Sequence, residues 1–321
     1  MSLEQTTKQQ YNILVVSKDD DTISAVRNAL LNPQYVLDVT NSAWVATKRV
    51  GTRFYDVVVW NADEKPDNNL KLLGYIKNNS PNTNIIVPAP YNPEFEERAL
   101  EQKLVYGFID TPVLPLRLQN SVAKATEMAN LYFDGKTGFY TEKQFKSRLE
   151  AEIAKLVNAD GKTSELIKRR GQPEYLSLLL IDIDRFKQIN DAYGHIEGGD
   201  LALHEVALAI RNSLRKTDIC GRYGGDESAV ILPYTDGTTF ESASDFAINK
   251  AEAIRKTVEG LEIMSAKGII KATVTIGVAT IPSAGIENTY TGLMNAADLA
   301  LYFLKNNGRR NEVMGHHNLP S

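Results

Sequence analysis

Short apolar runs alternate with amphipathic segments over residues 10–110. The runs are rich in valine and isoleucine, which is typical of buried β-strands. Between them, apolar residues recur every three or four positions, for example over 22–31 and 70–77, and this spacing predicts helices. The alternation predicts an α/β fold, a doubly wound parallel five-stranded sheet with helices on both faces. The expected strands are Ile13–Val16, Tyr35–Val39, Val57–Trp60, Asn84–Val87 and Gly107–Ile109.

A longer amphipathic helix is expected from about Pro115 to Phe133. Its apolar residues fall at spacings of three and four and therefore form one stripe. They are Leu118, Val122, Ala125, Ala129 and Tyr132. Two interpretations of this helix remain open. It is either the last helix packed on the sheet, or a stalk that connects two domains and pairs with its twin in a dimer.

Residues 134–138, Asp-Gly-Lys-Thr-Gly, end this helical pattern and mark a domain boundary. In the second half, the continuous apolar run before residue 183 is typical of a central strand. The polar residues 158–173 predict a surface insertion. The elements expected after the boundary are a helix over 141–157, a strand over 175–183, two helices, a hairpin, a helix over 242–259, a strand over 270–279 and a helix over 290–306.

The composition narrows the classes of function. With 321 residues, 43% of them hydrophobic and 24% charged, the chain is long enough for two globular domains. The net charge of −4 is spread evenly and gives no basic patch for nucleic acid. The N-terminus lacks the apolar core of a signal peptide, and no apolar run is long enough to span a membrane, so we expect a cytoplasmic protein. The single cysteine, Cys220, excludes an internal disulfide and lies in an apolar run where it is expected to pack.

Residues 221–228 read Gly-Arg-Tyr-Gly-Gly-Asp-Glu-Ser and lie between two β-like runs, 218–223 and 228–232. This pattern predicts a tight hairpin with two carboxylates, Asp226 and Glu227, at its tip. The glycines allow positive φ and let an anion approach the backbone. Carboxylates bind hard divalent cations. The octet therefore suits a metal–nucleoside triphosphate, and an ordinary solvated Gly-Asp turn is the alternative.

A second group of polar residues follows the buried strand over 178–183. The strand ends in Asp182-Ile183-Asp184, and acids at such a position are costly unless a cation or hydrogen bonds compensate them. A helix that begins near Phe186 would direct its first N–H groups at a bound phosphate, and Lys187 adds positive charge beside them. This segment therefore predicts a further part of a metal–nucleotide site.

Residues 134–314 resemble the GGDEF domain of diguanylate cyclases. Domains of that family have a palm-like α/β core with a central antiparallel sheet, and they condense two GTP into cyclic di-GMP and two pyrophosphates. The resemblance implies a receiver-like unit over 1–114, a connecting helix over 115–133, the GGDEF domain over 134–314 and a polar tail over 315–321. We expect His316 and His317 in that tail to be disordered. The matching segments are Thr137-Gly138, Leu180–His195, Arg215–Glu227, Thr273–Ala279 and Ala297–Arg309.

The resemblance also implies the roles of single residues. Two Mg²⁺ ions, or Mn²⁺, would be held by the Asp182 carboxylate, the Ile183 carbonyl, Asp226 and Glu227. Asp226 is also the expected base beside the ribose 3′-hydroxyl, and it acts with Lys187 as a catalytic residue. Each subunit would bind one GTP, so the product requires a homodimer whose two sites face each other.

The expected contacts to GTP divide by the part of the nucleotide they reach. The guanine edge is assigned to Asn190 and Asp200. The triphosphate is assigned to three cationic side chains, Lys187, Lys305 and Arg309. The phosphates are also assigned to the backbone N–H groups of Phe186 and Lys187 at the start of a helix.

Residues 215–218, Arg-Lys-Thr-Asp, directly precede the hairpin and match the Arg-x-x-Asp motif of the family's product-inhibition site. The resemblance implies that Arg215 binds guanine and phosphate of cyclic di-GMP and that Asp218 accepts from guanine N–H groups. Arg222 lies where the family often has a supporting arginine. The alternative is a local surface pair of arginine and aspartate, which contributes little to stability.

The chain departs from the family pattern at four places. Ser228 replaces a phenylalanine, a loss that costs about 3–5 kcal/mol if the site is otherwise unchanged. The segment 194–200 carries one residue more than usual, and the extra residue lies directly before Asp200, which is assigned to guanine. Lys136 and residues 141–143 also differ from the usual residues. An alternative function is therefore a catalytically weak or inactive GGDEF protein that senses cyclic di-GMP or GTP.

Residues 12–130 resemble the receiver domain of response regulators, but the groups for phosphoryl transfer are missing. The run Tyr-Asp-Val-Val-Val-Trp-Asn places Asn61 at the phospho-acceptor position, and an amide cannot form an acyl phosphate. Asp56 precedes this strand and therefore lies at the wrong end of the sheet. The other replacements are Ser17-Lys18 for the acidic pair, Ala89 for the usual Thr or Ser, and Thr111 for the usual Lys.

Asp19–Asp21 come too late in the sequence to supply the acidic pair and are expected to start a helix. We therefore interpret the first half as a pseudo-receiver that does not use phosphorylation. It would serve dimerisation or bind a signalling partner.

Overall fold

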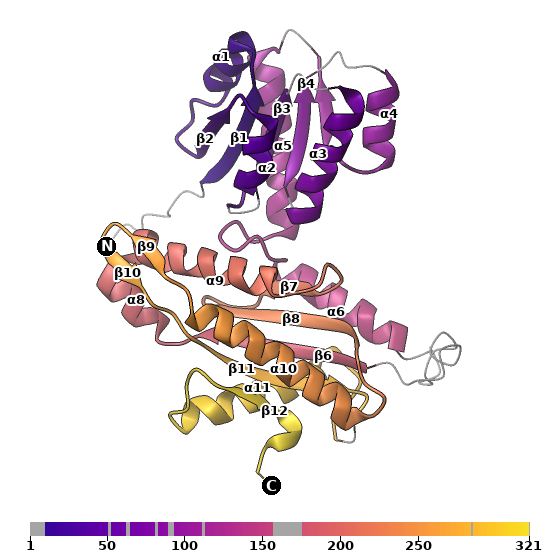
Figure 1. Ribbon diagram of the computed structural model, residues 1–321, viewed down its shortest axis with the longest axis vertical. Coiled ribbons are helices and arrows are strands. Elements are labelled where there is room, and N and C mark those ends of the chain that lie inside the picture. The colour runs from indigo at the N-terminus through magenta and orange to yellow at the C-terminus, as the bar shows by residue number, and fades with distance from the viewer. Residues whose placement is uncertain are drawn as a thin grey trace, which may run out of the picture. The chain divides into compact units, whose positions relative to one another are not determined.

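The computed structural model describes residues 10–50, 53–61, 65–80, 83–88, 93–110, 113–156, 175–283 and 285–320 (Figure 1). The chain divides into two compact units, Met1–Gly138 and Phe139–Ser321, called the first and second unit below. The expected surface insertion over 158–173, Ala89 and Thr111 lie outside the described residues. Across the described part of the chain, no helix has both the length and the hydropathy needed to cross a membrane.

The first unit contains a parallel five-stranded sheet in the order β2-β1-β3-β4-β5, as expected. Side chains on both faces of β1 are buried in separate clusters, since Ile13 and Val15 belong to one and Leu14 and Val16 to the other. This burial on both faces explains why the strands read as continuous apolar runs. The strands are β1 (Tyr11–Ser17), β2 (Tyr35–Thr40), β3 (Val57–Asn61), β4 (Asn84–Pro88) and β5 (Gly107–Ile109).

Helices cover both faces of this sheet (Figure 1). Buried residues of α2, α3 and α4 join the cluster on one face, and those of α1 and α5 join the cluster on the other. The helices are α1 (Asp20–Ala29), α2 (Ala43–Val50), α3 (Pro66–Asn79), α4 (Pro93–Glu101) and α5 (Pro115–Tyr132). The doubly wound fold predicted from the sequence is therefore confirmed.

Helix α5 has two different parts along its length. Leu118, Val122 and Ala125 are fully buried against the sheet, whereas Leu131 and Tyr132 near its end are exposed. The first part agrees with the interpretation as the last helix of the sheet. Pairing of the second part with a twin helix stays a prediction.

The second unit is built on a five-stranded sheet in the order β12-β11-β6-β8-β7. All neighbouring strands are antiparallel except β11 and β12, so the antiparallel core expected from the resemblance is confirmed. Central strand β6 is buried along its whole length, with alternate residues in two clusters on opposite faces. The strands are β6 (Tyr175–Ile183), β7 (Ile219–Arg222), β8 (Glu227–Thr235), β9 (Ile263–Ser265), β10 (Gly268–Ile270), β11 (Val274–Ile281) and β12 (Val313–Gly315).

The helices of this unit lie on both faces of the sheet (Figure 1). Buried residues of α9 and α10 share a cluster with one face, and those of α6 and α11 share a cluster with the other. The helices are α6 (Glu142–Leu156), α8 (Phe186–Tyr193), a π-helix (His195–Asp200), α9 (Leu201–Asn212), α10 (Phe240–Glu259), α11 (Tyr290–Asn306) and a 3₁₀ turn (His316–Asn318).

The single strand expected over 270–279 is wrong in its first part. Strand β10 ends at Ile270 and forms a small hairpin with β9, and β11 starts only at Val274. Between them Thr273 bonds to Asp184 instead of continuing the strand: its carbonyl accepts from the Asp184 N–H, and its hydroxyl donates to the Asp184 carboxylate.

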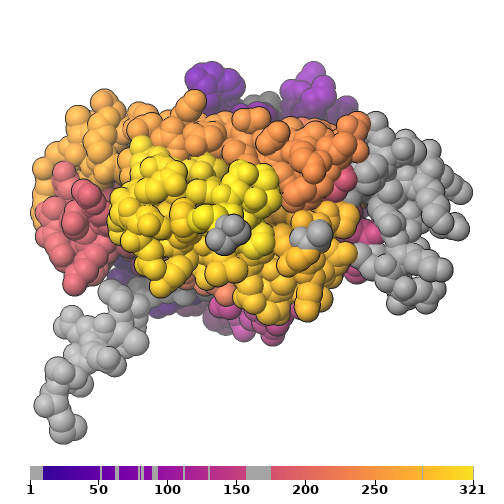
Figure 2. Space-filling model, turned by 90° about the horizontal axis from the view of Figure 1, so that it is seen from below, coloured from indigo at the N-terminus to yellow at the C-terminus, as the bar shows by residue number. Residues whose placement is uncertain are grey.

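The expected disorder of the C-terminal histidines is also wrong. Val313–Gly315 forms edge strand β12, parallel to β11, and His316 starts the 3₁₀ turn. The His317 ring meets the Phe240 ring edge to face at 5.6 Å between centroids. Figure 2 shows this C-terminal segment (yellow) lying against α10 (orange). Edge pairing and an aromatic contact hold a segment whose composition alone resembles a polar tail.

Candidate active site

Two predicted metal ligands are neighbours at one end of the second sheet. Asp182 of β6 and Glu227 of β8 are directly paired in the strand register. Because side chains alternate along a strand, both carboxylates lie on the face that carries α11. From that helix Lys305 Nζ reaches Asp182 Oδ2 at 2.6 Å. The structure therefore brings together two of the predicted acids and one of the predicted cations.

The Asp182 carboxyl is largely buried, and its pKa is perturbed accordingly. Burial raises this pKa from 3.8 to about 6. The hydrogen bond and charge of Lys305 act in the lowering direction, and the nearby Asp226 and Glu227 act in the raising direction. The end of the sheet thus concentrates negative charge that one lysine only partly balances.

Asp184, two residues further along, has a different role. Its Oδ2 accepts from the Thr273 hydroxyl at 2.7 Å and from the Asn311 backbone N–H at 2.9 Å. Its Oδ1 accepts from the Thr275 hydroxyl at 2.6 Å. This carboxylate ties β6 to β11 and to the chain before β12. Sequence reasoning gave Asp184 no role, although threonines at alternate positions 273 and 275 were a usable signal for its hydrogen bonds.

The hairpin tip forms as predicted, but its glycines serve another purpose than expected. The Glu227 carbonyl accepts from the N–H groups of Tyr223 and Gly224 at 2.9 and 3.2 Å. Positive φ occurs at other glycines of the chain, and neither Gly224 nor Gly225 adopts it, so that expectation is wrong. A Cβ on Gly224 would lie 2.5 Å from the Glu227 carboxylate, so a larger residue there would displace this side chain, whereas Gly225 borders open space.

Arg222 is bonded to this turn. Its Nη2 donates to the Gly225 carbonyl at 2.6 Å and its Nε to the Gly224 carbonyl at 3.2 Å. It does not line the pocket that holds Arg215 and Asp218. Ser228 follows the turn in regular pairing with Ile181 and Arg222, so the hairpin is intact at this departure from the family pattern.

Helix α8 begins directly after Asp184. Arg185 precedes it with a left-handed φ of 53°, so the chain turns sharply between the end of β6 and the helix. The first N–H groups of a helix, here those of Phe186 and Lys187, have no acceptor within the helix and can bind phosphate.

The extra residue of segment 194–200 is absorbed as a turn of π-helix. Gly199 N–H donates to the Gly194 carbonyl at 2.9 Å, a five-residue step. A Cβ on Gly199 would lie 1.9 Å from Asn190 Oδ1, so the π-helix packs directly on Asn190. The segment before Asp200 is thus held against the other residue predicted to contact guanine.

The donor chemistry of the site fits Mg²⁺, since it offers carboxylate and carbonyl oxygens. Asp182 and Glu227 are adjacent, and the Ile183 N–H donates to the Asp226 carbonyl at 3.4 Å, which fixes the hairpin tip beside β6. Within the described ranges, however, no three acidic, histidine or cysteine side chains converge closely enough to bind a metal. Lys305 forms an ion pair with the Asp182 carboxylate, and the predicted phosphate ligand Arg309 forms one with Glu312.

The two residues of the predicted product site, Arg215 and Asp218, line the same small pocket. Arg215 pairs with Asp236 rather than with Asp218, at 2.6 Å, and its guanidinium lies 5.0 Å from the centroid of the Phe246 ring. Asp218 Oδ2 accepts the Arg215 backbone N–H at 2.8 Å. Burial raises the pKa of the Asp218 carboxyl, with nearby cations acting the other way. Sequence reasoning missed Asp236 and Phe246.

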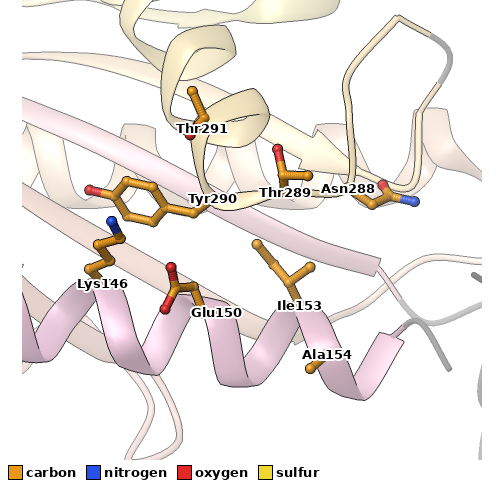
Figure 3. Close-up of a pocket in the computed structure, with 8 residues that line it drawn as sticks. All are labelled: Lys146, Glu150, Ile153, Ala154, Asn288, Thr289, Tyr290 and Thr291. Atoms are coloured by element: carbon orange, nitrogen blue, oxygen red, sulfur yellow. The ribbon is translucent and has the colours of Figure 1, made fainter. Parts of the chain in front are cut away.

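A larger cavity of about 430 Å³ opens between α6 and the start of α11. In Figure 3 Tyr290 and Lys146 face each other across it, and Lys146 Nζ lies 5.1 Å from the centroid of the tyrosine ring. Burial raises the pKa of Tyr290 to about 12. None of the site residues predicted from the sequence lines this cavity. Cys220, by contrast, is buried in the core as expected, and burial raises its pKa to about 12, so it is an inert thiol.

In the first unit, Asn61 ends β3 opposite Ser17 of β1. Its amide donates to the hydroxyls of Thr22 at 3.0 Å and Ser17 at 3.3 Å. Asp19 accepts from the N–H groups of Asp21 and Thr22 and so caps α1, as predicted. At the position where a receiver carries its phospho-acceptor, the Asn61 amide is thus hydrogen-bonded to two hydroxyls, next to the capped start of α1.

Comparisons with known proteins support the same family. The model of the diguanylate cyclase GGDEF domain matches residues 131–311. Diguanylate cyclase A of Treponema denticola is 42% identical over 147 residues, which are 46% of this chain and 37% of that protein. Response regulator PleD of Caulobacter vibrioides is 30% identical over 272 residues, which are 81% of this chain and 56% of that protein. The chain thus spans about half the length of these relatives, or less.

Solved GGDEF domains are among the similar structures. That of TpbB from Pseudomonas aeruginosa is 29% identical, with a TM-score of 0.47 over 58% of this chain and 94% of that one. That of DgcB from Caulobacter crescentus, in complex with c-di-GMP, is 28% identical, with a TM-score of 0.47 over 58% and 96%. The family match alone covers more than half of the chain, including the acidic hairpin and the end of β6. The chain therefore belongs to the diguanylate cyclase GGDEF family and carries a receiver-like unit before its GGDEF domain.

Proposed function

We propose that this protein condenses two GTP into cyclic di-GMP and two pyrophosphates across a homodimer. The observation that carries the proposal is the pair of register neighbours Asp182 and Glu227, which face Lys305 at one end of the second sheet. Two carboxylates and a lysine close to the start of helix α8 suit a metal-bound triphosphate. As part of this proposal, the receiver-like unit covers 1–114, the connecting helix 115–133 and the GGDEF domain the chain from 134 onward, including β12.

In this proposal each residue has a defined task. Asp182, the Ile183 carbonyl, Asp226 and Glu227 would hold two Mg²⁺ ions, which would neutralise charge on the phosphates and acidify the ribose hydroxyl. Asp226 would accept the proton of the 3′-hydroxyl. Lys305 would leave Asp182 and turn to the phosphates once the carboxylate is neutralised.

The other tasks concern binding. Lys187 and Arg309 would add positive charge at the triphosphate, beside the backbone N–H groups of Phe186 and Lys187. Asn190 and Asp200 would bind the guanine edge. Arg215 and Asp218 would bind the product and lower turnover, with Arg222 supporting the hairpin that lies next to them.

The direct test is to incubate the purified protein with GTP and Mg²⁺ and to separate the nucleotides by chromatography. Cyclic di-GMP is expected, and the Arg215→Ala variant should accumulate more of it because product inhibition is relieved. Absence of product from both proteins would overturn the enzyme proposal.

A second candidate is a sensor that binds cyclic di-GMP without turnover. It is favoured by Ser228 and by the π-helix that takes up the extra residue before Asp200. Calorimetry with cyclic di-GMP tests it, because binding without any product from GTP would support the sensor. Binding that is unaffected by Arg215→Ala would exclude the Arg215 pocket for either function.

The Mg²⁺ affinity should fall as the pH drops through about 6. The pKa of Asp182 is raised from 3.8 to about 6, so a proton competes with the cation below that value. The same shift favours the folded state without Mg²⁺ below pH 4, and this contribution is lost as the pH rises through 6. The increase in unfolding temperature caused by Mg²⁺ should therefore be large at about pH 8 and small at about pH 5.

The matched control is Lys305→Met. Removing the lysine removes a partner that lowers the pKa of Asp182, so the midpoint of this Mg²⁺ effect should move to higher pH. A midpoint that does not move, or an effect of equal size at both pH values, would show that Asp182 is not the titrating ligand.

Ser228→Phe should raise both stability and turnover. Ser228 is paired with Ile181, and side chains on that face of β6 and β8 join the cluster under α9 and α10. A phenyl group there should add about 1 kcal/mol to the free energy of unfolding by burying apolar surface. Ser228→Thr is the control, because it changes the backbone preference without adding a ring. An unchanged rate in Ser228→Phe would show that this position does not limit turnover.

The first unit should not respond to a phosphoryl donor such as acetyl phosphate. Asn61 offers an amide that is bonded to Thr22 and Ser17, and an amide cannot form the acyl phosphate. Mass spectrometry should show no phosphate on the parent chain, and turnover should be unchanged. We propose that this unit instead contacts a second copy or a signalling partner; an aspartyl phosphate in the parent chain would contradict the pseudo-receiver interpretation.

A further inference from the structure

One exposed aromatic residue at the product pocket has an unusual backbone. Tyr234, in β8, has a φ of 55°, and its side chain is 48% exposed. Left-handed backbone is rare for a bulky residue and costs on the order of 1–3 kcal/mol. Tyr234 lines the same pocket as Arg215 and Asp218.

A β-bulge creates this conformation. The register of β6 and β8 pairs Ser177 with Leu232 and then Tyr175 with Thr235. Two residues of β8, Pro233 and Tyr234, therefore stand opposite a single residue of β6. Such an extra residue bends a strand and redirects a side chain that the regular alternation would place elsewhere.

The bulge is fixed on both sides by buried hydrogen bonds. The Thr235 hydroxyl lies 2.9 Å from the Leu232 carbonyl and 3.1 Å from the Ser177 hydroxyl, which in turn lies 2.8 Å from that of Thr280. Thr235 and Ser177 are almost fully buried. These hydrogen bonds hold the strained backbone of Tyr234 in place. Tyr234 is therefore exposed from a fixed position in strand β8 rather than from a loop.

The residues that line this pocket with Tyr234 include groups that bind a planar, anionic ligand. Arg215 places a flat cation over Phe246, Asp218 offers an acceptor for N–H groups, and Lys250 adds a second cation. Purine bases stack on aromatic rings and on guanidinium planes, and nucleotide phosphates pair with lysine and arginine. We propose that Tyr234 is a base-stacking residue of the cyclic di-GMP site, which holds a guanine face while Asp218 binds its edge.

This inference rests on the proposed product site at Arg215 and Asp218, and the experiment separates the two. Calorimetry of the full chain with cyclic di-GMP compares the parent with Tyr234→Asn, because asparagine tolerates left-handed backbone and lacks the ring. Loss of one stacked base should weaken binding by about 10-fold or more. Tyr234→Phe keeps the ring and should bind within about 2-fold of the parent.

Two further variants complete the test. Tyr234→Gly removes the ring with no backbone strain and should reproduce the loss seen with asparagine, so that a folding defect in one variant does not decide the result. Tyr302→Asn alters another exposed tyrosine, on α11, and should bind like the parent. The unfolding temperature of the unliganded Tyr234→Asn and Tyr234→Gly variants should not fall, since these two residues relieve the backbone strain.

Each outcome has a distinct meaning. Loss with Asn and Gly but not with Phe supports the stacking role. Unchanged binding in the ring-free variants, together with loss in Arg215→Ala, would overturn the role of Tyr234 and leave the proposed product site standing. If cyclic di-GMP does not bind the parent, or if Arg215→Ala binds normally, both the product site and the stacking role are wrong.

Discussion

Asp182→Asn should reduce the formation of cyclic di-GMP on the order of a thousand-fold while the protein stays folded. The carboxylate that would hold the cation is lost, but the amide has nearly the same size and needs no charge in a buried position. Because burial raises the pKa of Asp182, replacing it should not destabilise the protein without Mg²⁺, and should make it slightly more stable near neutral pH. Turnover, and unfolding with and without Mg²⁺, are the measurements.

Asp184→Asn is the matched control, two residues away in the same segment. Its carboxylate accepts from Thr273, Thr275 and the Asn311 backbone, and an amide nitrogen would face one of these donors. The free energy of unfolding should fall by about 1–3 kcal/mol, since a buried donor is left without an acceptor. Turnover of the folded protein at low temperature should remain. Equal loss of turnover in the two variants, with both folded, would contradict the separation of metal ligand and structural acid.

Gly277→Ala should destabilise the second unit by about 2–3 kcal/mol. A Cβ at this position of β11 would lie 2.2 Å from the Ala297 carbonyl oxygen and 2.6 Å from the Leu301 nitrogen, both in the backbone of α11. Backbone atoms cannot change rotamer, so the helix must move away from the sheet and lose packing. Urea unfolding of the full chain, followed by circular dichroism, measures the effect.

Two controls test whether the loss of stability comes from the contact with α11 and is confined to the second unit. Gly225→Ala makes the same substitution where nothing lies within 4 Å, and should leave stability unchanged. Both tryptophans, Trp44 and Trp60, belong to the first unit, so their fluorescence should report an unfolding transition that Gly277→Ala does not move. Tolerance of Gly277→Ala would mean that α11 does not pack as closely as described.

The sequence predicts well those strands and helices that follow from a local pattern of apolar residues. The strands of the first unit follow from valine and isoleucine runs that are buried on both faces, and β6 follows from its unbroken apolar stretch. The pairing of Asp182 with Glu227 follows once both are placed at strand ends. The resemblance to the GGDEF family supplied what these patterns do not contain, namely the identity of the nucleotide.

What the sequence could not predict depends on contacts between distant residues. The bond of Lys305 to Asp182 joins residues far apart in the chain, and only the packing of α11 on β11 brings them together. Strand β12, Val-Met-Gly, is too short for its sequence to show an alternating pattern, and it forms because it pairs with the edge of β11. The π-helix before Asp200 forms because Gly198 and Gly199 fit against Tyr193 and Asn190, and this fit has no signature in spacing alone.

The close contact at Gly277 has a consequence for the chemistry as well as for stability. Lys305 lies one turn beyond Leu301 on the same helix, so any outward movement of α11 carries its ammonium away from Asp182. Gly277, which has no side chain and lies outside the site, thus helps to set the charge balance at the end of β6. A relative of this protein can keep every acid and every cation of the motif and still lose their alignment through one methyl group at this position.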